Sequence, residues 1–226
     1  IRKLALLLST LCAAGAALAD ITVGVSVSAT GPAASLGIPE KNTFALLPQS
    51  IAGEKVKWIV LDDATDPTAG VKNVRKMISE DKADVLIAAT ATPVSMAILE
   101  VAFETKTAQI AMAPVPPAGE KSAWIFSTPQ NFGLMATAIA EHMAASGVKS
   151  IGFIGYADPY GELWLKAMQG AADAKGIKVT AVERYQRNDT SVTGQALKIM
   201  AANPDAVLVA GSGTPAVLPQ PTLVER

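Results

Sequence analysis

Short apolar runs alternate with longer amphipathic stretches along most of the chain. The apolar runs are rich in Val, Ile and Ala and are continuous, which is typical of strands buried on both faces. We expect strands at 21–27, 56–61, 85–89, 109–112, 124–127, 150–154, 178–184 and 206–210. Helical spacing between most of them predicts helices at 33–50, 68–80, 94–105, 132–145, 160–174 and 192–202. This alternation predicts an α/β fold with parallel sheets covered by helices on both faces.

A residue followed by proline recurs where expected strands lead into helices. These pairs are Gly31-Pro32, Asp66-Pro67, Thr92-Pro93, Asp158-Pro159 and Thr214-Pro215. Proline suits the first helical position, and a preceding Thr or Asp accepts a bond from the exposed backbone N–H groups. Each pair alone indicates only a good helix start. Together they gather helix N-termini at the carboxyl edge of a parallel sheet, where such sheets bind ligands and where anions are favoured. The pattern predicts a small carboxylate as ligand.

The first nineteen residues have the three-part pattern of a cleavable export signal. Arg2 and Lys3 supply the positive start, an apolar run follows, and Ala17-Leu18-Ala19 is the expected cleavage site. The apolar run is shorter than the ~20 residues that a membrane span needs. We therefore expect a periplasmic protein that begins at Asp20 and has no lipid anchor at Cys12, which follows a leucine rather than a small residue.

Two strand–helix series follow, separated at 128–133. This predicts a signal peptide at 1–19, a first lobe at 20–130 and a partial second lobe at 131–226. Thr128-Pro129 resembles the other pairs but is interpreted as a crossing between the lobes.

Net charge and cysteine content limit the kinds of binding partner and cross-link that we expect. Removing residues 1–19 takes away Arg2 and Lys3, which lowers the 19 basic residues to 17 against 20 acidic ones, and the net charge from −1 to −3. Without a basic block, nucleic acid is not expected as a partner. The single cysteine lies in the expected signal, so no disulfide is expected after cleavage. We expect no membrane insertion after cleavage, and a monomer.

Catalytic patterns are scarce. His142 is the single histidine, and no Gly-x-Ser-x-Gly or Gly-x-Gly-x-x-Gly motif is present. Asp62-Asp63 could hold a metal, but the pair more simply ends a strand and forms a turn. We expect no catalytic residue, no metal and no cofactor, and therefore not an enzyme.

Unlike catalytic patterns, hydroxyl-bearing residues are numerous at the sheet edge where we expect a ligand to bind. They follow the first and third long strands and include Ser26, Ser28, Thr30, Ser35, Thr90, Thr92 and Ser95, with Tyr156 and Tyr160 in the second series. Such groups hydrogen-bond an acid without reacting with it. Strand content alone also explains Ser26 and Ser28, and helix capping alone also explains Thr92.

Three segments together resemble the substrate-binding proteins of branched-chain amino-acid ABC transporters, the leucine/isoleucine/valine-binding family. They are 29–37 (ATGPAASLG), 62–67 (DDATDP) and 155–161 (GYADPYG), in matching order and spacing. The resemblance covers 20–226. It implies a type I periplasmic binding fold, with two doubly wound parallel-sheet lobes, a hinge, and a ligand held between the lobes.

The resemblance also implies site residues. The loop after the third long strand would bind the ligand carboxylate through Thr90 and Thr92, and Tyr160 matches the family's cleft tyrosine. Ser35 and Leu36 would neighbour the side-chain pocket, and Ser212 and Thr214 would lie on the loop after the last strand.

Three departures affect the ligand. Residues 113–115 (APV) stand where amino-acid binders usually offer a Ser/Thr-bearing loop. The acidic partner of the ligand ammonium lies beyond Arg226 in the family. The family also continues past that residue, so we interpret the sequence as a fragment whose second lobe is incomplete.

The sequence therefore predicts a protein that captures a small carboxylate, foremost a branched-chain or related amino acid, by hinge closure and delivers it to an ABC permease. An aromatic or other organic acid is the alternative within the same transport class. An exported α/β enzyme and the sensor domain of a receptor are the alternatives from other classes.

Overall fold

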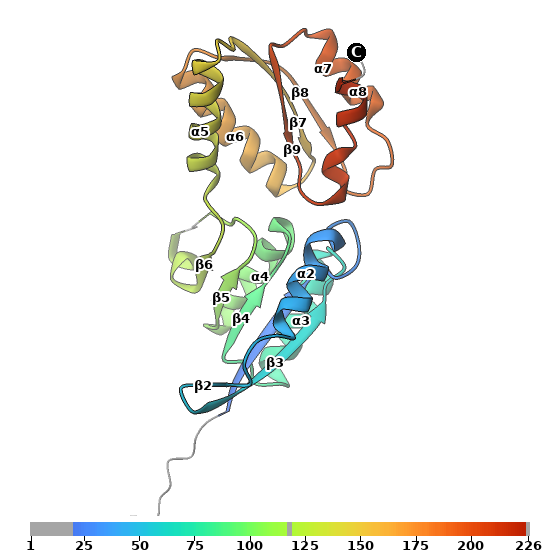
Figure 1. Cartoon of the computed structure of the whole chain (residues 1–226). Helices are drawn as coiled ribbons and strands as arrows, with labels where there is room; N and C mark the ends of the chain where they lie inside the picture. The colour runs from blue at the N-terminus through green and yellow to red at the C-terminus, as the bar shows by residue number, and fades with distance from the viewer. Residues whose placement is uncertain (1–19, 117–118, 225–226) are drawn as a thin grey trace, which may run out of the picture.

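The computed structural model describes residues 20–116 and 119–224, which form two α/β lobes (Figure 1). The first lobe contains β1 (Ile21–Val27), α2 (Ala34–Phe44), β2 (Ser50–Ile51), β3 (Glu54–Asp62), α3 (Pro67–Ser79), β4 (Val85–Ala88), α4 (Thr92–Thr105), β5 (Ala108–Ala111), the 3-10 helix η1 (Gly119–Trp124) and β6 (Ile125–Ser127). The second contains α5 (Phe132–Ala145), β7 (Ser150–Tyr156), α6 (Pro159–Ala174), β8 (Lys178–Tyr185), α7 (Thr193–Ala201), β9 (Ala206–Ala210), η2 (Thr214–Val217) and α8 (Gln220–Val224). The expected export signal at 1–19 lies outside the described residues.

The first sheet has the strand order β2-β3-β1-β4-β5-β6. All its pairs are parallel except β2 with β3. Successive strands are added on opposite sides of β1, so the strand order changes direction between β1 and β4. The second sheet, β8-β7-β9, is parallel and changes direction at its central strand β7. Ligands of open α/β sheets bind beside the carboxyl ends of strands at such points.

Helices cover both faces of the first sheet, as the continuous apolar strands predict. Val23, Val25 and Val27 of β1 pack with Phe44 of α2 on one face. On the other face, α3 and α4 bury a cluster that includes Met77. Alternate β1 residues point to opposite faces, and the strand is buried along nearly its whole length.

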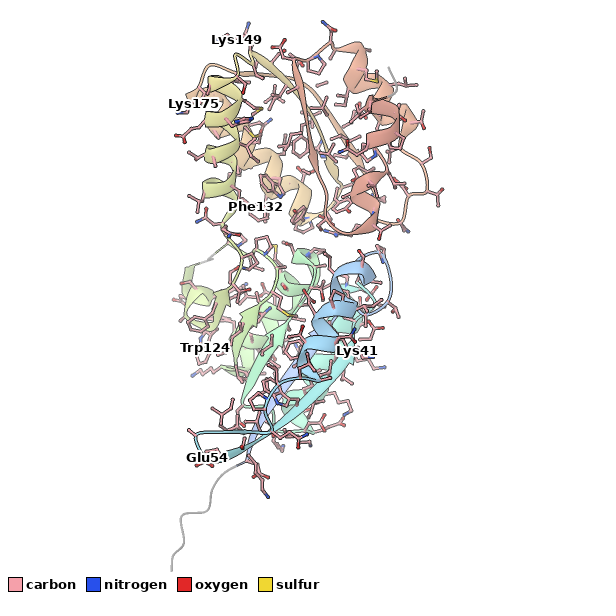
Figure 2. The ribbon with its side chains drawn as sticks, viewed as in Figure 1. Lys41, Glu54, Trp124, Phe132, Lys149 and Lys175 are labelled. Carbon is pink, nitrogen blue, oxygen red and sulfur yellow. The ribbon has the colours of Figure 1, made fainter. Side chains whose placement is uncertain are left out.

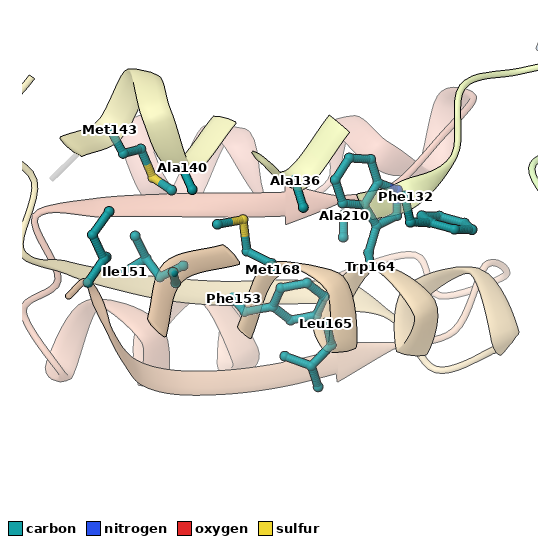
Figure 3. Close-up of a cluster of buried hydrophobic side chains, with 12 residues drawn as sticks. Phe132, Ala136, Ala140, Met143, Ile151, Phe153, Trp164, Leu165, Met168 and Ala210 are labelled. Atoms are coloured by element: carbon teal, nitrogen blue, oxygen red, sulfur yellow. The ribbon is translucent and has the colours of Figure 1, made fainter. Parts of the chain in front are cut away.

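The core of the second lobe lies between β7 and the helices α5 and α6. Figure 3 shows Phe153 of β7 and Met168 of α6 inside this cluster, with Phe132 and Trp164 at one end. The rings of Phe132 and Trp164 meet edge to face, with their centroids 5.6 Å apart. This arrangement fixes the start of α5 against α6.

The expected long strands are all present, with ends that differ by one or two residues. The helix expected at 33–50 is too long, because α2 ends at Phe44 and a hairpin follows. Ala52 and Gly53 both adopt positive φ, 52° and 91°, which forms a tight turn between β2 and β3. The indole N–H of Trp58 donates to the Pro48 carbonyl at 3.0 Å and closes this loop.

The expected helix caps are partly correct. Asp66 accepts from the N–H of Ala69 at 2.7 Å, and Asp158 accepts from the N–H of Tyr160 at 2.8 Å. Thr92 is not a cap, because it is the first helical residue and Ala91 takes the extended cap conformation. Asn131, which the sequence reading did not identify, caps α5 by accepting from the N–H of Leu134 at 2.8 Å. Of the two remaining pairs, Gly31-Pro32 and Thr214-Pro215, neither caps a helix through a side chain.

Within the described residues, no helix is both long enough and apolar enough to cross a bilayer.

Asp63 ties the ends of β1 and β3 together. Its carboxylate is fully buried and accepts from the hydroxyls of Ser26 at 2.8 Å and Ser28 at 2.6 Å, and from the N–H of Thr65 at 3.0 Å. Burial raises the pKa of this carboxyl, although the bonds from Ser28 and Ser26 lower it. The Asp62-Asp63 pair therefore ends a strand and forms a turn. The hydroxyls of Ser26 and Ser28, which were candidate binding groups, donate to Asp63 instead.

Asp158 has a similar position in the second lobe. Besides capping α6, it pairs with Arg187 at 2.5 Å between Oδ2 and Nε, and both side chains are largely buried, at 17% and 11% exposed. The Arg187 guanidinium lies 4.1 Å from the centroid of the Tyr156 ring. The ion pair therefore joins α6, the segment after β8 and the end of β7.

Replacing Asp63 with Ala should lower the free energy of unfolding by about 2–4 kcal/mol, because two buried hydroxyls lose their acceptor. Asp63→Asn should cost less, since its amide oxygen still accepts from Ser28 and Thr65. Because the folded pKa of Asp63 is raised, its ionisation makes the wild type lose stability relative to Asp63→Asn as pH rises from about 4 through the folded pKa. Urea unfolding at several pH values measures both effects, and equal costs for the two variants would contradict this account.

Replacing Asp158 with Ala should lower the free energy of unfolding by about 3–5 kcal/mol, because Arg187 stays buried without its partner and α6 loses its cap. Asp158→Asn keeps an oxygen for the cap and isolates the ionic contribution. Glu162→Ala is the matched control, since its pair with Arg184 is about half exposed and should contribute about 0–1 kcal/mol. The same urea titration ranks the three variants, and a loss for Asp158→Ala no larger than that for the control would be the contrary result.

Candidate functional site

The carboxyl ends of β1 and β4 in the first lobe face the second lobe across a cleft of about 350 Å³. Both lobes line it. The lining residues are Leu36, Pro39, Glu40, Thr90, Ala91, Thr92, Met112, Ala113, Pro114, Pro129, Met135, Tyr160 and Ser212. Mostly apolar walls with a few convergent polar groups are typical of small-molecule sites, and this one lies at the change of strand direction.

The structure brings most of the sequence-predicted site residues together. Leu36, Thr90 and Thr92 line the cleft from the first lobe, and Tyr160 and Ser212 line it from the second. The other two, Ser35 and Thr214, meet each other instead, and the N–H of Thr214 donates to the Ser35 hydroxyl at 3.1 Å. This hydrogen bond joins the two lobes directly. That these residues bind a ligand stays a prediction.

The two threonines that line the cleft are already hydrogen-bonded. Thr90 Oγ1 accepts from the N–H of Ser28 at 2.9 Å and donates to the carboxylate of Glu40. Thr92 Oγ1 donates to the Pro114 carbonyl at 3.1 Å. Both side chains are buried, so these bonds fix their orientation.

Aromatic side chains build the wall of the second lobe. Tyr160 packs edge to face on Phe132, with centroids 5.7 Å apart, and burial raises the pKa of its phenol. The Tyr156 hydroxyl donates to the Ser212 carbonyl at 2.6 Å and accepts from the Ser212 N–H at 3.2 Å. Figure 2 shows Phe132 at the end of α5 that faces the first lobe, whereas Lys149 and Lys175 lie at the far end of the second.

Sequence reasoning missed Glu40, Pro39 and both methionines of the cleft, but it had placed 113–115 at the ligand loop. Glu40 could have been found, since it follows Leu36 by four residues on α2 and shares its helix face. Met112 directly follows β5, but nothing in its local pattern distinguishes it from a core residue. Met135 belongs to the second lobe and reaches the cleft only through the packing of the lobes.

A larger hollow of about 900 Å³ lies outside α5 and α6, against the segment that crosses between the lobes. Its lining includes Leu134 and Lys166 on the outer helix surfaces. It lies away from the carboxyl ends of the β1–β4 and β7–β9 pairs, so the smaller cleft is the better candidate. In the part of the chain that the structure describes, no three His, Cys, Asp or Glu side chains gather as metal ligands.

Known proteins share this architecture. A solved extracellular ligand-binding receptor from Rhodopseudomonas palustris is 49% identical, with a TM-score of 0.89, over 92% of this chain and 58% of that one. A second receptor, from Rhodopseudomonas palustris HaA2, is 47% identical, with a TM-score of 0.90 and the same coverage. The chain thus spans 58% of the length of these two receptors. More distant solved structures, 20% identical in the case of a leucine binding protein from Thermotoga maritima, share the fold.

No curated protein matches the chain. The family model described as periplasmic binding protein matches residues 20–220, which include every element of both sheets. The chain belongs to the periplasmic binding protein family and has its type I fold.

Proposed function

We propose that this protein is a solute-binding protein that captures a small organic acid between its lobes and delivers it to an ABC permease. The observation that carries the proposal is the cleft of about 350 Å³, lined from both lobes at the carboxyl ends of the strands. A periplasmic location belongs to the proposal, supported by the export-signal pattern at 1–19 and by the family. The expectation that the protein is not an enzyme is supported by relatives named as ligand-binding receptors.

Closure of the lobes is the proposed mechanism. A ligand that contacts Leu36 of one lobe and Tyr160 of the other binds the closed state more tightly than the open one, and so increases its population. The Ser35–Thr214 hydrogen bond forms at the place where the lobes meet. Gly213, beside it, has φ 70° and approaches the first lobe closely.

For the ligand, we propose an aromatic carboxylic acid. Tyr160, Met112 and Met135 line the cleft, and methionine sulfur and aromatic rings both make favourable contacts with a ring. Among distant neighbours with this fold, one was solved with 3,4-dihydroxybenzoic acid and another with benzoate.

A branched-chain amino acid is the second candidate. The observation that favours it is Glu40, an acidic side chain in the cleft where a ligand ammonium needs a partner. A leucine binding protein is also among the distant neighbours.

A ligand panel tests the proposal on the complete gene product. Benzoate and 3,4-dihydroxybenzoate should raise the thermal midpoint more than leucine, isoleucine or valine. A ligand at 100 times its Kd adds about 2.7 kcal/mol to the free energy of unfolding. If no acid shifts the midpoint at millimolar concentration, or if the pure protein turns any of them over, the proposed function is wrong.

Gly213→Ala should separate closure from stability. An added Cβ would lie 3.2 Å from Ser35 Oγ, which would push that hydroxyl from its place beside the Thr214 N–H and weaken the contact between the lobes, and the backbone conformation adds strain. Gly176→Ala is the control for a positive φ alone, since its φ is 68° and nothing lies within 4 Å of the added Cβ. Gly213→Ala should lose about 1–3 kcal/mol of stability, because φ 70° with ψ −168° is a region that essentially only glycine adopts, and Gly176→Ala about 1–2 kcal/mol. Only Gly213→Ala should raise the apparent Kd, by about tenfold, because the closed state is less populated. Calorimetric titration of both proteins measures this, and unchanged affinity in Gly213→Ala would show that closure does not need this contact.

A further inference from the structure

Glu40 is the one acidic side chain among the cleft-lining residues of the described chain. It lies on α2 and is half-buried. Its Oε2 accepts the proton of the Thr90 hydroxyl. Its other oxygen, Oε1, accepts no hydrogen bond from the described residues, so it is available to a ligand.

Thr90 has no proton left for a ligand while this bond exists. A hydroxyl carries one proton, and that of Thr90 goes to Glu40. The proton of Thr92 goes to the Pro114 carbonyl. The two cleft-lining threonines, Thr90 and Thr92, therefore offer no free hydroxyl donor to a ligand carboxylate in this state.

The charge on this wall also disfavours a carboxylate. The cleft-lining residues of the described chain include no Lys, Arg or His. Burial raises the pKa of the Glu40 carboxyl and the charge of Asp63 raises it further, against the hydrogen bond from Thr90, which lowers it. A ligand carboxylate beside Glu40 would add a further like charge to a half-buried site, which is unfavourable.

We propose that Glu40 is a specificity-determining residue that accepts a hydrogen bond from a donor group on the ligand and turns the ligand carboxylate away from the wall formed by α2 and Thr90. This inference rests on the proposed function. The donor is a ring hydroxyl if the ligand is an aromatic acid, and the ammonium group if it is an amino acid. Either one pairs with Oε1 while Thr90 holds Oε2, so the carboxylate arrives already oriented.

The shape of the site supports this role. Leu36 shares the face of α2 with Glu40, so an apolar contact and an acceptor lie one helical turn apart on the same wall. A ligand without the donor would close the cleft over an unpaired carboxylate oxygen, which is costly. The site therefore discriminates in two ways, by binding ligands that carry the donor group and by disfavouring ligands that lack it.

Matched ligand pairs test the proposal by calorimetric titration of the complete gene product. 4-Hydroxybenzoate and benzoate differ only in a ring hydroxyl, and leucine and 4-methylpentanoate differ only in the ammonium group. The wild type should prefer the donor-bearing member of the pair that it binds by at least about tenfold, a difference of about 1.4 kcal/mol. In Glu40→Met, which keeps the side-chain length but has no carboxylate, the preference should fall to within about threefold.

Glu40→Gln identifies the source of the donor. Its neutral amide oxygen still accepts from a ring hydroxyl, so a preference for 4-hydroxybenzoate should survive in part, whereas a preference for leucine should be lost with the charge. It also tests the proposal if Glu40→Met does not fold. Glu120→Gln, an exposed position away from the cleft, should keep the wild-type preference.

The contrary outcomes are distinct. A wild type that binds both members of a pair equally overturns the role of Glu40 while the proposed function stands. Equal weakening of both members in Glu40→Met also overturns it, because Glu40 would then only support Thr90. A wild type that binds none of the four acids refutes the proposed function and this inference with it.

Discussion

Parallel pairing between β1 and β4 is the constraint on which the rest of the site depends. The register places Ser26 beside Ala88, and because both strands run in the same direction, the residues that follow them emerge together. Ser28 then reaches Thr90, to which its N–H donates at 2.9 Å. The hydroxyl of Ser28 reaches Asp63 at the end of β3. Three strand ends thus form one hydrogen-bonded platform, and the orientation of Thr90 towards Glu40 is a consequence of it.

The second lobe builds its side of the cleft by different means. Its platform is a stack of rings around a cation, in which Arg187 lies over Tyr156 and pairs with Asp158. Tyr156 in turn holds the backbone of Ser212 through two hydrogen bonds. Because most polar groups of each platform are paired within their own lobe, the lobes meet through few polar contacts, of which Ser35–Thr214 is one. Two lobes that each have their own core and share a sparse polar contact are suited to opening and closing as units.

The sequence was sufficient for the architecture because most of the strands are nearly continuous apolar runs, which favour a parallel sheet covered on both faces. It was not sufficient where two signals competed. The apolar and polar spacing continues past Phe44, so the helix prediction ran on into a hairpin whose signal is confined to Ala52 and Gly53. Thr92 precedes a proline just as Asp66 and Asp158 do, but the preceding Ala91 is extended, and the helix begins one residue earlier than the pattern suggested.

Prediction of the site residues was limited because a buried hydroxyl group can hydrogen-bond to another side chain of the protein instead of to a ligand. Ser26 and Ser28 lay at the correct edge of the sheet, but a sequence cannot tell whether a buried hydroxyl faces a ligand or another side chain. Local pattern also gives no warning that Arg187, far along the chain from Asp158, completes the second wall.

In the function that we propose, the internal hydrogen bonds of these hydroxyls determine how the cleft discriminates between ligands. A group already paired inside the protein contributes little to binding, because a bond to the ligand would only replace an existing one. Groups that can still form a hydrogen bond decide specificity. At the wall of the first lobe that group is an acceptor, Oε1 of Glu40, and the charge of Asp63 acts on the same carboxyl. An acceptor held by α2 and Thr90 cannot turn away from a ligand that brings no donor. The pairing of β1 with β4 fixes Thr90 and, through it, Glu40. In the role that we propose, a solute that donates a hydrogen bond to Oε1 of Glu40 therefore favours closure of the lobes more than a solute that cannot.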